Sequence, residues 1–422
     1  MPEVPAALPV IEIPEIHFNK VAPLFSNLPE AKQTVDIQPM EQFNQGWGTI
    51  LYRTTLPEAT LAGTVLKITE VHDWAQIYAD GKLLARLDRR KGEFTTTLPA
   101  LKKGTQLDIL VEAMGRVNFA KSIHDRKGIT EKVELILGNQ AKELKNWTVY
   151  NFPVDYSFIK DKKYNDTKIL PAMPAYYKST FKLDKVGDTF LDMSTWGKGM
   201  VWVNGHAMGR FWEIGPQQTL FMPGCWLKEG ENEILVLDLK GPAKASIKGL
   251  KKPILDVLRE KAPETHRKDG EKLKLAGEKV THEGAFTPGN GWQEVRFAAP
   301  VKGRYFCLEA LSPQANDNIA AVAEFDVLGA DGKPVSREHW KIRYADSEET
   351  RSGNRTADKI FDLQESTFWM TVDNVPYPHQ LVIDLSKVET VTGFRYLPRA
   401  EKEYPGMIKE YRVYVKSADF NY

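Results

Sequence analysis

One short stretch of the chain, MVWVNGHAMGRFW at residues 200–212, concentrates residue types that active sites and binding sites use. It holds two tryptophans, one histidine, one arginine and an Asn-Gly pair. The histidine, His206, could carry a proton near neutral pH, and the tryptophans could stack against a ligand. The same residues could equally be the framework of a fold. The elements around the stretch decide between these two interpretations.

The stretch has a counterpart earlier in the chain, because IYADGKLLARL aligns with VWVNGHAMGRF. Asp80 matches Asn204 at an offset of 124 residues (204 − 80). Arg86 matches Arg210 at the same offset (210 − 86). Two copies of one β-sandwich module explain such a repeat. We expect the duplicated arginines to form buried or interfacial ion pairs.

Each copy places an Asx-Gly pair between two strand-like runs, and the glycines are Gly81 and Gly205. Such pairs supply the positive φ angles of a type I′ hairpin turn. An element that two modules share is favoured to be architectural, and the position of His206 is held by Lys82 in the first copy. We therefore predict turns at both places and packing roles for the tryptophans.

Composition limits the class of protein. The 422 residues include 57 Lys and Arg against 56 Asp and Glu, for a net charge of +1. This balance argues against nucleic acid or an anionic membrane as the main partner. No apolar run approaches the length of a membrane span. The two cysteines, Cys225 and Cys307, exclude a disulfide framework but leave a single bridge open.

Short alternating runs such as GTVLKITEV, QLDILVEA and EYRVYVK dominate the chain, as in β-sandwiches. The start, MPEVPAALPVIEIPEI, is punctuated by proline like a linker and lacks a signal-peptide pattern. We predict an all-β chain of tandem sandwich or jelly-roll domains without a TIM barrel. Its predicted parts are a proline-rich linker and lead-in segment (1–45), a first sandwich (46–145), a second sandwich (146–250), a short helix, KPILDVLREK, with a linker (251–270) and a third sandwich (271–422).

Motifs in the last third of the chain stand in a distinctive order: FDLQESTFW, then LVIDL, then YLPR. This order resembles the discoidin-type (coagulation factor five/eight) galactose-binding-like sandwich. The closing strands of that family are similar to RYFCLEAL and AEFDVLG, which here lie upstream of the other motifs. The resemblance therefore predicts a circularly permuted sandwich over residues 271–422. Permutation is tolerated when the termini of a domain lie close together.

The discoidin resemblance also implies a calcium position. Members of that family often bind calcium through the aspartate of the first turn and the glutamate of the AE element, which correspond here to Asp362 and Glu324. The motif has changed, because FDLQ replaces FDGD and removes a glycine and an acid. Fewer hard oxygen ligands therefore remain for calcium.

Related carbohydrate-binding modules hold sugars on loops at one end, with aromatic residues for the ring face and polar residues for the hydroxyls. The candidates here are Trp292, Trp369, His379 and Arg399. Each has a competing structural interpretation. Trp369 and Arg399 match framework positions of the fold, and His379 directly precedes a predicted core strand.

Residues 1–250 resemble the β-domains that follow the catalytic barrel in family-35 glycoside hydrolases, the β-galactosidases. Matching segments include VHDWAQIYADGKLL, HDRKGIT and MVWVNGHAMGRFWEIGPQQTLFMPGCW. The chemistry of that family needs two carboxyl groups across the sugar, about 5–5.5 Å apart in a retaining enzyme. Glu231 and Glu233 lie in a predicted turn and strand instead. We assign no catalytic residue, and whether this chain is an enzyme stays open.

Three functions are compatible with the resemblance. The chain could brace a catalytic TIM barrel in cis and hold galactosides or polysaccharide near it. It could be a free-standing, lectin-like binding protein, or a fragment that complements a separately encoded barrel in trans. The first predicts exposed apolar surface around the linker and the HDRKGIT and RFWEIGPQQ segments. By resemblance to the family we expect a periplasmic or extracellular location.

Overall fold

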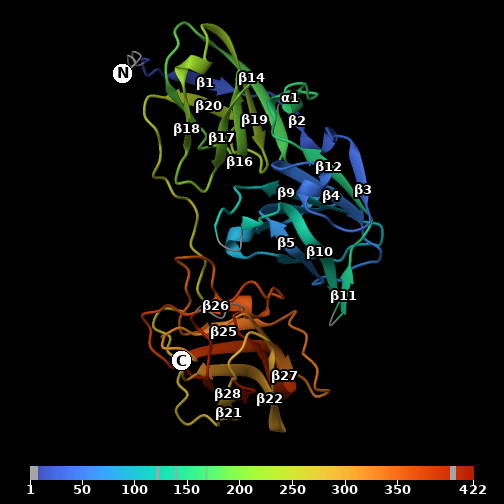
Figure 1. Cartoon of the computed structure of the whole chain (residues 1–422), viewed down its shortest axis with the longest axis vertical. Helices are drawn as coiled ribbons and strands as arrows, with labels where there is room; N and C mark the ends of the chain where they lie inside the picture. Colours follow the sequence, from blue (N-terminus) through green and yellow to red (C-terminus); the bar gives the residue numbers. More distant parts are fainter. Residues whose placement is uncertain (1–7, 120–122, 138–139, 168, 400–404) are drawn as a thin grey trace. The chain divides into compact units, whose positions relative to one another are not determined.

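The computed structural model describes residues 8–119, 123–137, 140–167, 169–399 and 405–422. Its contacts divide the chain into two units. The first comprises Met1–Lys32, Trp47–Thr49 and Tyr150–Lys261, and the second comprises Gln33–Gly46, Ile50–Val149 and Ala262–Tyr422. Antiparallel sheets provide nearly all the regular structure of the described residues, which confirms the predicted all-β class (Figure 1).

The sandwich of the first unit consists of two sheets, β1–β20–β15–β18 and β13–β2–β14–β19–β16–β17. Their strands are β1 (Ile13–His17), β2 (Lys20–Pro23), β13 (Asn165–Asp166), β14 (Ala175–Leu183), β15 (Thr189–Asp192), β16 (Lys198–Val203), β17 (His206–Trp212), β18 (Thr219–Met222), β19 (Gly230–Asp238) and β20 (Ser246–Leu250). In the core, the ring of Trp196 lies 5.2 Å from that of Phe18 and 5.1 Å from that of Tyr177.

The N-terminal segment is a structural part of this sandwich. β1 pairs with β20, and β2 pairs with β14. Ile13, Ile16 and Phe18 are buried in its core. The prediction of a linker over residues 1–45 is therefore wrong for these strands. The prediction treated Pro14 as a sign of a linker. This proline lies instead in an edge strand at a shift in register, where the missing N–H is tolerated.

A further sandwich is formed by sheets β11–β10–β5–β8 and β3–β12–β4–β9–β6–β7. Their strands are β3 (Ala31–Thr34), β4 (Gly48–Thr55), β5 (Val65–His72), β6 (Trp74–Ala79), β7 (Lys82–Asp88), β8 (Thr95–Thr97), β9 (Gln106–Ala113), β10 (Gly128–Leu137), β11 (Gln140–Glu143) and β12 (Trp147–Phe152). Tyr52 and Trp147 meet edge to face in its core, with ring centroids 6.5 Å apart.

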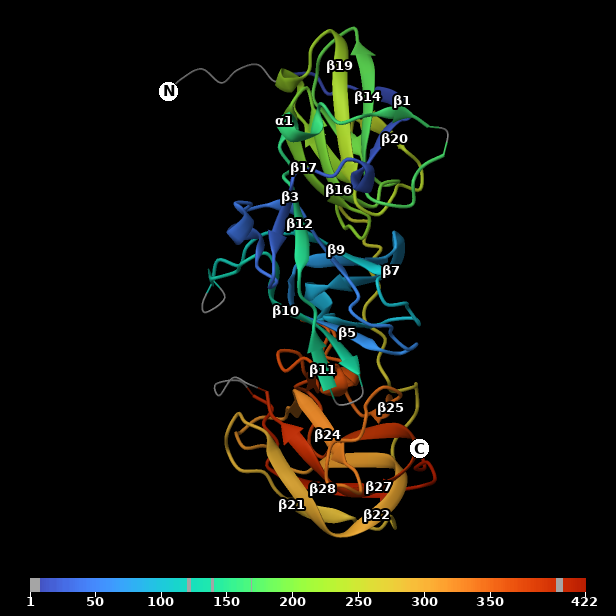
Figure 2. The ribbon, with the colours of Figure 1, turned by 90° about the vertical axis from the view of Figure 1, so that its right-hand side faces the viewer.

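Strands from both halves of residues 271–422 share one sheet, ordered β21–β28–β22–β27–β24, with β25 also paired to β27. The strands are β21 (His282–Ala285), β22 (Gln293–Ala310), β24 (Glu324–Leu328), β25 (Lys341–Ala345), β27 (His379–Leu397) and β28 (Glu410–Lys416), and β23 (Ala321–Val322) pairs with β26 (Trp369–Met370). The upstream strand β22 lies between the downstream strands β27 and β28, as a permuted sandwich requires (Figure 2).

Helical structure is confined to short turns. The described ones are α1 (Tyr156–Ile159) and the 3-10 turns η1 (Leu24–Ser26), η2 (Met40–Phe43), η3 (Arg89–Lys91), η5 (Gly224–Trp226) and η6 (Ala357–Phe361). Among the residues that the structure describes, no helix is long and apolar enough to cross a bilayer.

The helix predicted within residues 251–270 does not form at 252–261. This segment is extended and lies along the loop at 214–218. The N–H of Val257 donates to the carbonyl of Pro216 over 3.0 Å, and that of Arg259 donates to Ile214 over 2.8 Å. A helix shorter than about 12 residues is marginal in water, so these backbone bonds decide the conformation. The other domain boundaries stay predictions.

The two Asx-Gly pairs adopt the same geometry. Asp80 and Gly81 have φ angles of 45° and 78°, and Asn204 and Gly205 have 49° and 87°. Positive φ at both central residues is the signature of a type I′ turn. Each hairpin also shifts register at the same place, between residues 77 and 78 in one and between 201 and 202 in the other. The bulge therefore repeats at the offset of 124 residues that the sequence displays.

The residues around the second turn do not converge on a site. Trp202 is buried in β16, whereas His206 is exposed and stacks on Trp226 with 4.6 Å between ring centroids. Arg86 and Arg210 are exposed, so the expectation that they are buried is wrong, whereas the interfacial alternative stays a prediction. Both lie on the outer strand of a hairpin at a sheet edge, which leaves their side chains in solvent.

Candidate functional site

Two of the four sugar-binding candidates are buried in the third sandwich. Trp369 is 1% exposed, and its indole N–H donates to the carbonyl of Ser347 over 2.9 Å. His379 is 0% exposed, and its ring nitrogens lie 2.8 Å from Asp346 Oδ2 and 2.7 Å from the carbonyl of Asn318. Every polar atom of these rings has a partner in the protein. Both residues are therefore framework residues in this geometry.

The other two candidates belong to one cluster at the surface. Trp292 is half-buried and packs against the small cluster that contains Phe368. The guanidinium of Arg399 lies over the ring of Phe368, 4.3 Å from its centroid. Arg355 lies over the same ring at 4.3 Å. We call Arg355, Phe368 and Arg399, with Trp292 beside them, the arginine rim.

Sequence reasoning missed Arg355 and Phe368. Phe368 directly precedes the tryptophan of the T-x-W motif, so the alternation of a strand places it on the opposite face from the buried Trp369. Burial lowers the pKa of Arg355, and Glu349 offsets this only in part. The structure pairs the Arg355 side chain with no carboxylate among the residues that it describes. Its N–H groups are therefore suited to a ligand.

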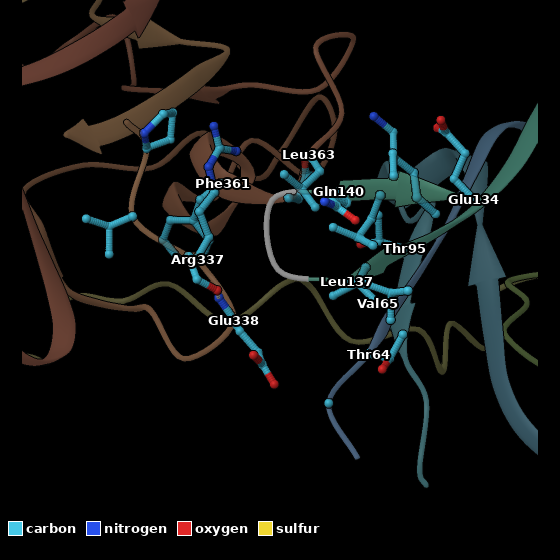
Figure 3. A pocket seen from close by; sticks show the side chains of 18 of the residues that line it. Thr64, Val65, Thr95, Glu134, Leu137, Gln140, Arg337, Glu338, Phe361 and Leu363 are labelled. Atoms are coloured by element: carbon cyan, nitrogen blue, oxygen red, sulfur yellow. Dashed lines mark hydrogen bonds between the residues drawn. The ribbon is translucent and has the colours of Figure 1, made fainter. Parts of the chain in front are cut away.

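A pocket of about 800 Å³ lies within the second unit. Figure 3 shows Arg337, Phe361 and Glu134 among its lining side chains. Its volume falls in the range of small-molecule sites. However, several of its charged groups are engaged with each other, as Lys132 Nζ is with Glu134 Oε1 at 2.9 Å. Phe361 is the single aromatic residue among its described lining residues. The arginine rim therefore suits a sugar better.

The two calcium candidates lie near each other. Glu324 begins β24 and is 2% exposed, and Asp362 follows η6. The hydroxyl of Thr367 donates to both oxygens of Asp362, over 2.9 and 2.8 Å. One oxygen of Glu324 accepts a hydrogen bond from Arg337, and the other has no partner among the described residues.

Burial is the main cause of the raised pKa of both acids. Burial raises the pKa of Glu324 to about 8, although Arg337 opposes the rise, and the nearby charge of Asp362 adds to it. Burial likewise raises the pKa of Asp362 to about 6, against the opposing charge of Lys359 and the hydrogen bond from Thr367. Both acids therefore need positive charge beside them to stay ionised.

Protein side chains supply that charge. Arg337 contacts Glu324 and Asp326, and Arg395 also binds Asp326. The ammonium of Lys359 lies 3.7 Å from Asp362. These contacts set three basic groups against three acidic groups, which leaves the cluster balanced.

The residues present do not fit calcium. Calcium takes six to eight oxygen ligands. Among the described residues no group of three or more acidic, histidine or cysteine side chains could hold a metal. Arg337 already engages one oxygen of Glu324. The calcium implied by the discoidin resemblance therefore lacks support in this geometry.

HDRKGIT forms a buried ionic network in the first half of the chain. The ammonium of Lys127, 0% exposed, donates to Asp73 over 2.7 Å, to Asp125 over 2.8 Å and to the carbonyl of Gly115 over 3.0 Å. Burial by itself would raise the pKa of Asp125, but hydrogen bonds from Lys127 and Arg89 lower it to about 2. The motif itself is a framework, whereas Phe119 and Ile123 just before it are 80% and 61% exposed, which agrees with the exposed apolar surface predicted around it.

The segment before the third sandwich is tied to it by hydrogen bonds of His266 and Arg267. The ring of His266 lies 2.8 Å from Glu348 Oε1, and its backbone N–H donates to the other oxygen over 2.5 Å. Burial lowers the pKa of His266, but the hydrogen bond with Glu348 outweighs this and raises it overall. The pair is therefore strongest when the ring is protonated.

Comparison with known families agrees with this architecture. Residues 38–154 match the family described as beta-galactosidase, first all-beta domain. Residues 174–232 match beta-galactosidase, galactose-binding domain, and residues 344–422 match the F5/8 type C domain. Two stretches of the chain therefore match domain types described for beta-galactosidases. The third match also agrees with the discoidin resemblance of the last third.

Curated β-galactosidase relatives match over part of their length. Beta-galactosidase-1-like protein 2 of Homo sapiens is 33% identical over 47% of this chain. Beta-galactosidase of Xanthomonas manihotis is 32% identical over 52%, and beta-galactosidase-1-like protein 3 of Rattus norvegicus is 31% identical over 56%. This chain spans only 31%, 36% and 38% of those three proteins, respectively.

Solved structures give weak likenesses. A Pleurotus ostreatus lectin has a TM-score of 0.18 and 9% identity, covering 58% of this chain and 81% of that chain. An α-L-rhamnosidase of Streptomyces avermitilis has a TM-score of 0.20 and 10% identity, covering 91% of this chain and 46% of that chain. Likenesses this low carry no functional argument.

Replacing Lys127 should destabilise the sandwich that contains it. Lys127→Met leaves Asp73 and Asp125 buried without their shared cation, and breaking a buried pair costs about 3–5 kcal/mol. Urea unfolding followed by tryptophan fluorescence measures the loss. Lys132→Met is the control, because its partly exposed pair with Glu134 should contribute less than about 1 kcal/mol. Equal losses in the two variants would contradict the buried network.

The His266 pair should make stability depend on pH. Because the folded pKa of His266 is raised, the pair stabilises fully below the unfolded pKa and is lost as pH rises through the folded pKa. His266→Gln should cost about 2 kcal/mol in acid, the scale of a hydrogen bond to a charged group, and much less in alkali. Thermal unfolding at a series of pH values tests this. A difference that stays constant across neutrality argues against the pair.

Proposed function

We propose that the chain is a non-catalytic, carbohydrate-binding part of a β-galactosidase-type glycoside hydrolase, which holds galactoside-containing glycans for a catalytic barrel. The arginine rim is the observation that carries this proposal. The matches to a galactose-binding domain and to an F5/8 type C domain support it. By the same resemblance we place the chain in the periplasm or outside the cell.

The rim offers what a sugar needs. A guanidinium presents several N–H donors in a fixed plane, which suits the neighbouring hydroxyls of a pyranose. The ring of Phe368 holds Arg355 and Arg399 in place through contacts between cation and ring face. Trp292 contributes an apolar side to the same cluster. Galactose has both hydroxyls and an apolar C–H face to match these groups.

Weak binding is enough for this role. A tethered module raises the local concentration of glycan near a catalytic site without high affinity. Such a module needs an exposed site rather than a deep pocket. The half-buried Arg355 and Arg399 meet that requirement.

Bracing of a barrel is supported by apolar side chains on the first unit. Leu255 and Leu258 are 55% and 64% exposed in the extended segment beside the RFWEIGPQQ loop, and Phe221 is 52% exposed in β18. The first unit thus places exposed leucines beside RFWEIGPQQ, one of the segments where the sequence predicts a docking surface. A free-standing lectin-like protein has no use for such residues, whereas a domain in cis or a barrel in trans would cover them.

Calorimetric titration with galactose and with lactose tests the sugar site. We expect saturable heat for the wild-type chain. Arg399→Met and Arg355→Met should each weaken binding by about tenfold or more, because hydrogen bonds from charged donors contribute about 1.5–3 kcal/mol. Arg304→Met is the matched control, since Arg304 pairs with Asp384 away from the rim. Full affinity in both rim variants would remove the rim from the proposal.

Mixing the chain with a purified family-35 barrel tests the bracing role. We expect the two to co-elute in size-exclusion chromatography, and Leu258→Asp to reduce the complex by about tenfold or more, because burying an unpaired charge is costly. Leu61→Asp is the control, because Leu61 is 79% exposed in the second unit. Sugar binding without any association favours the free-standing lectin. Hydrolysis that appears only on mixing favours complementation in trans.

A further inference from the structure

We propose that the guanidinium of Arg337 takes the position of a structural cation in the third sandwich, so that this domain keeps its fold without calcium. The proposal concerns residues 262–422 alone and is independent of the sugar site. It rests on three observations: the contacts of Arg337, the charge balance around it and two oxygen atoms that it leaves unpaired.

The contacts of Arg337 are those of a bridging cation. Its Nε and Nη2 donate to Asp326 Oδ1 over 2.9 and 2.6 Å, and its Nη1 donates to Glu324. The side chain is 11% exposed. A guanidinium keeps its charge at all physiological pH values and directs its donors in a fixed plane. Arg337 therefore holds two buried carboxylates together, which is the task of a bound metal ion.

The bridge ties together segments that are distant in sequence. Glu324 and Asp326 lie on β24, and Arg337 lies on the loop after it. Arg395, on β27, binds the second oxygen of Asp326. The carboxylate of Asp326 thus connects β24 to the neighbouring strand β27 and to the loop that carries Arg337. A calcium ion at this place would give no connection that the arginines do not already make.

Charge balance argues in the same direction. Arg337, Arg395 and Lys359 contact the three acids Glu324, Asp326 and Asp362. With all three acids ionised these groups sum to zero formal charge, and protonation of Glu324 would make the sum positive. A divalent ion would add two positive charges beside a fixed guanidinium in a region of low polarity, where repulsion between like charges is strong. The native cluster therefore excludes calcium.

In the part of the chain that the structure describes, two buried oxygen atoms near Arg337 lack hydrogen-bond partners and could become cation ligands if Arg337 were removed. Glu324 Oε1 and Gln364 Oε1 have no hydrogen-bond partner among the described residues. Removal of the guanidinium would free the second oxygen of Glu324 as well. Together with Asp362 these atoms would form an oxygen-rich, negatively charged site, which is the chemistry that calcium prefers. The substitution should therefore turn an independent domain into a calcium-dependent one.

Thermal unfolding of the full chain in calcium and in chelator tests the proposal. About 10 mM calcium exceeds the dissociation constants of weak extracellular modules. We expect no shift for the wild type. Arg337→Met should melt lower in chelator and recover by about 5 °C in calcium. Arg343→Met is the matched control, because it breaks a pair with Asp419 in the same sandwich and should show no recovery.

Other outcomes would overturn the proposal. A wild-type melting temperature that rises in calcium would show that the metal, not Arg337, fills the position. Equal melting of Arg337→Met in calcium and chelator would show that Arg337 does not occupy a cation site. If Arg337→Met does not fold, equilibrium dialysis of the wild type with radioactive calcium decides. One bound ion that Glu324→Gln abolishes would refute the proposal, and no bound ion would support it.

Discussion

Lys127 and Arg337 each carry a full positive charge into the interior of a β-sandwich, and each meets two carboxylates there. An uncompensated charge in such a place would cost several kcal/mol, which is comparable to the whole stability of a domain. The segments that carry these groups must therefore arrive together when the chain folds. The HDRKGIT loop and the edge strand β24 owe their positions to this requirement.

In the third sandwich, the arginine rim and the ionic cluster around Arg337 are linked through the side chain of Arg395. Arg395 binds Asp326 in the cationic cluster, and its guanidinium also lies over the ring of Trp292, 4.6 Å from the centroid. The indole N–H of Trp292 donates to Glu365 over 3.1 Å. One flank of the arginine rim is thus anchored by the charges that hold β24. Rigid support of this kind improves a binding site, because less freedom is lost when the ligand binds.

Local patterns in the sequence predicted local structure well. The repeat with an offset of 124 residues predicted two equivalent hairpins, and the strands of a permuted sandwich were expected from the motif order. These inferences succeeded because turn chemistry and alternation act over a few residues. The prediction of a helix at 252–261 was wrong because backbone hydrogen bonds to a loop distant in sequence determine the conformation of this segment.

The site could be predicted only in part. Trp292 and Arg399 do lie in one cluster, but nothing in the sequence pairs Arg355 with Phe368, because their contact depends on how a loop folds onto a strand. The burial of His379 was foreseen only as an alternative. The role of Arg337 was invisible, since its partners lie 11 and 13 positions away and carry no motif that includes an arginine.

The permuted strand order has a consequence for synthesis on the ribosome. β22 emerges early, yet the strand that lies along one of its edges, β28, begins 100 residues after β22 ends (410 − 310). During that interval one edge of a long strand remains without its partner. Exposed edges are where chains pair wrongly with one another. Translation rate and chaperone access therefore matter more for this sandwich than for one whose neighbouring strands are made in succession.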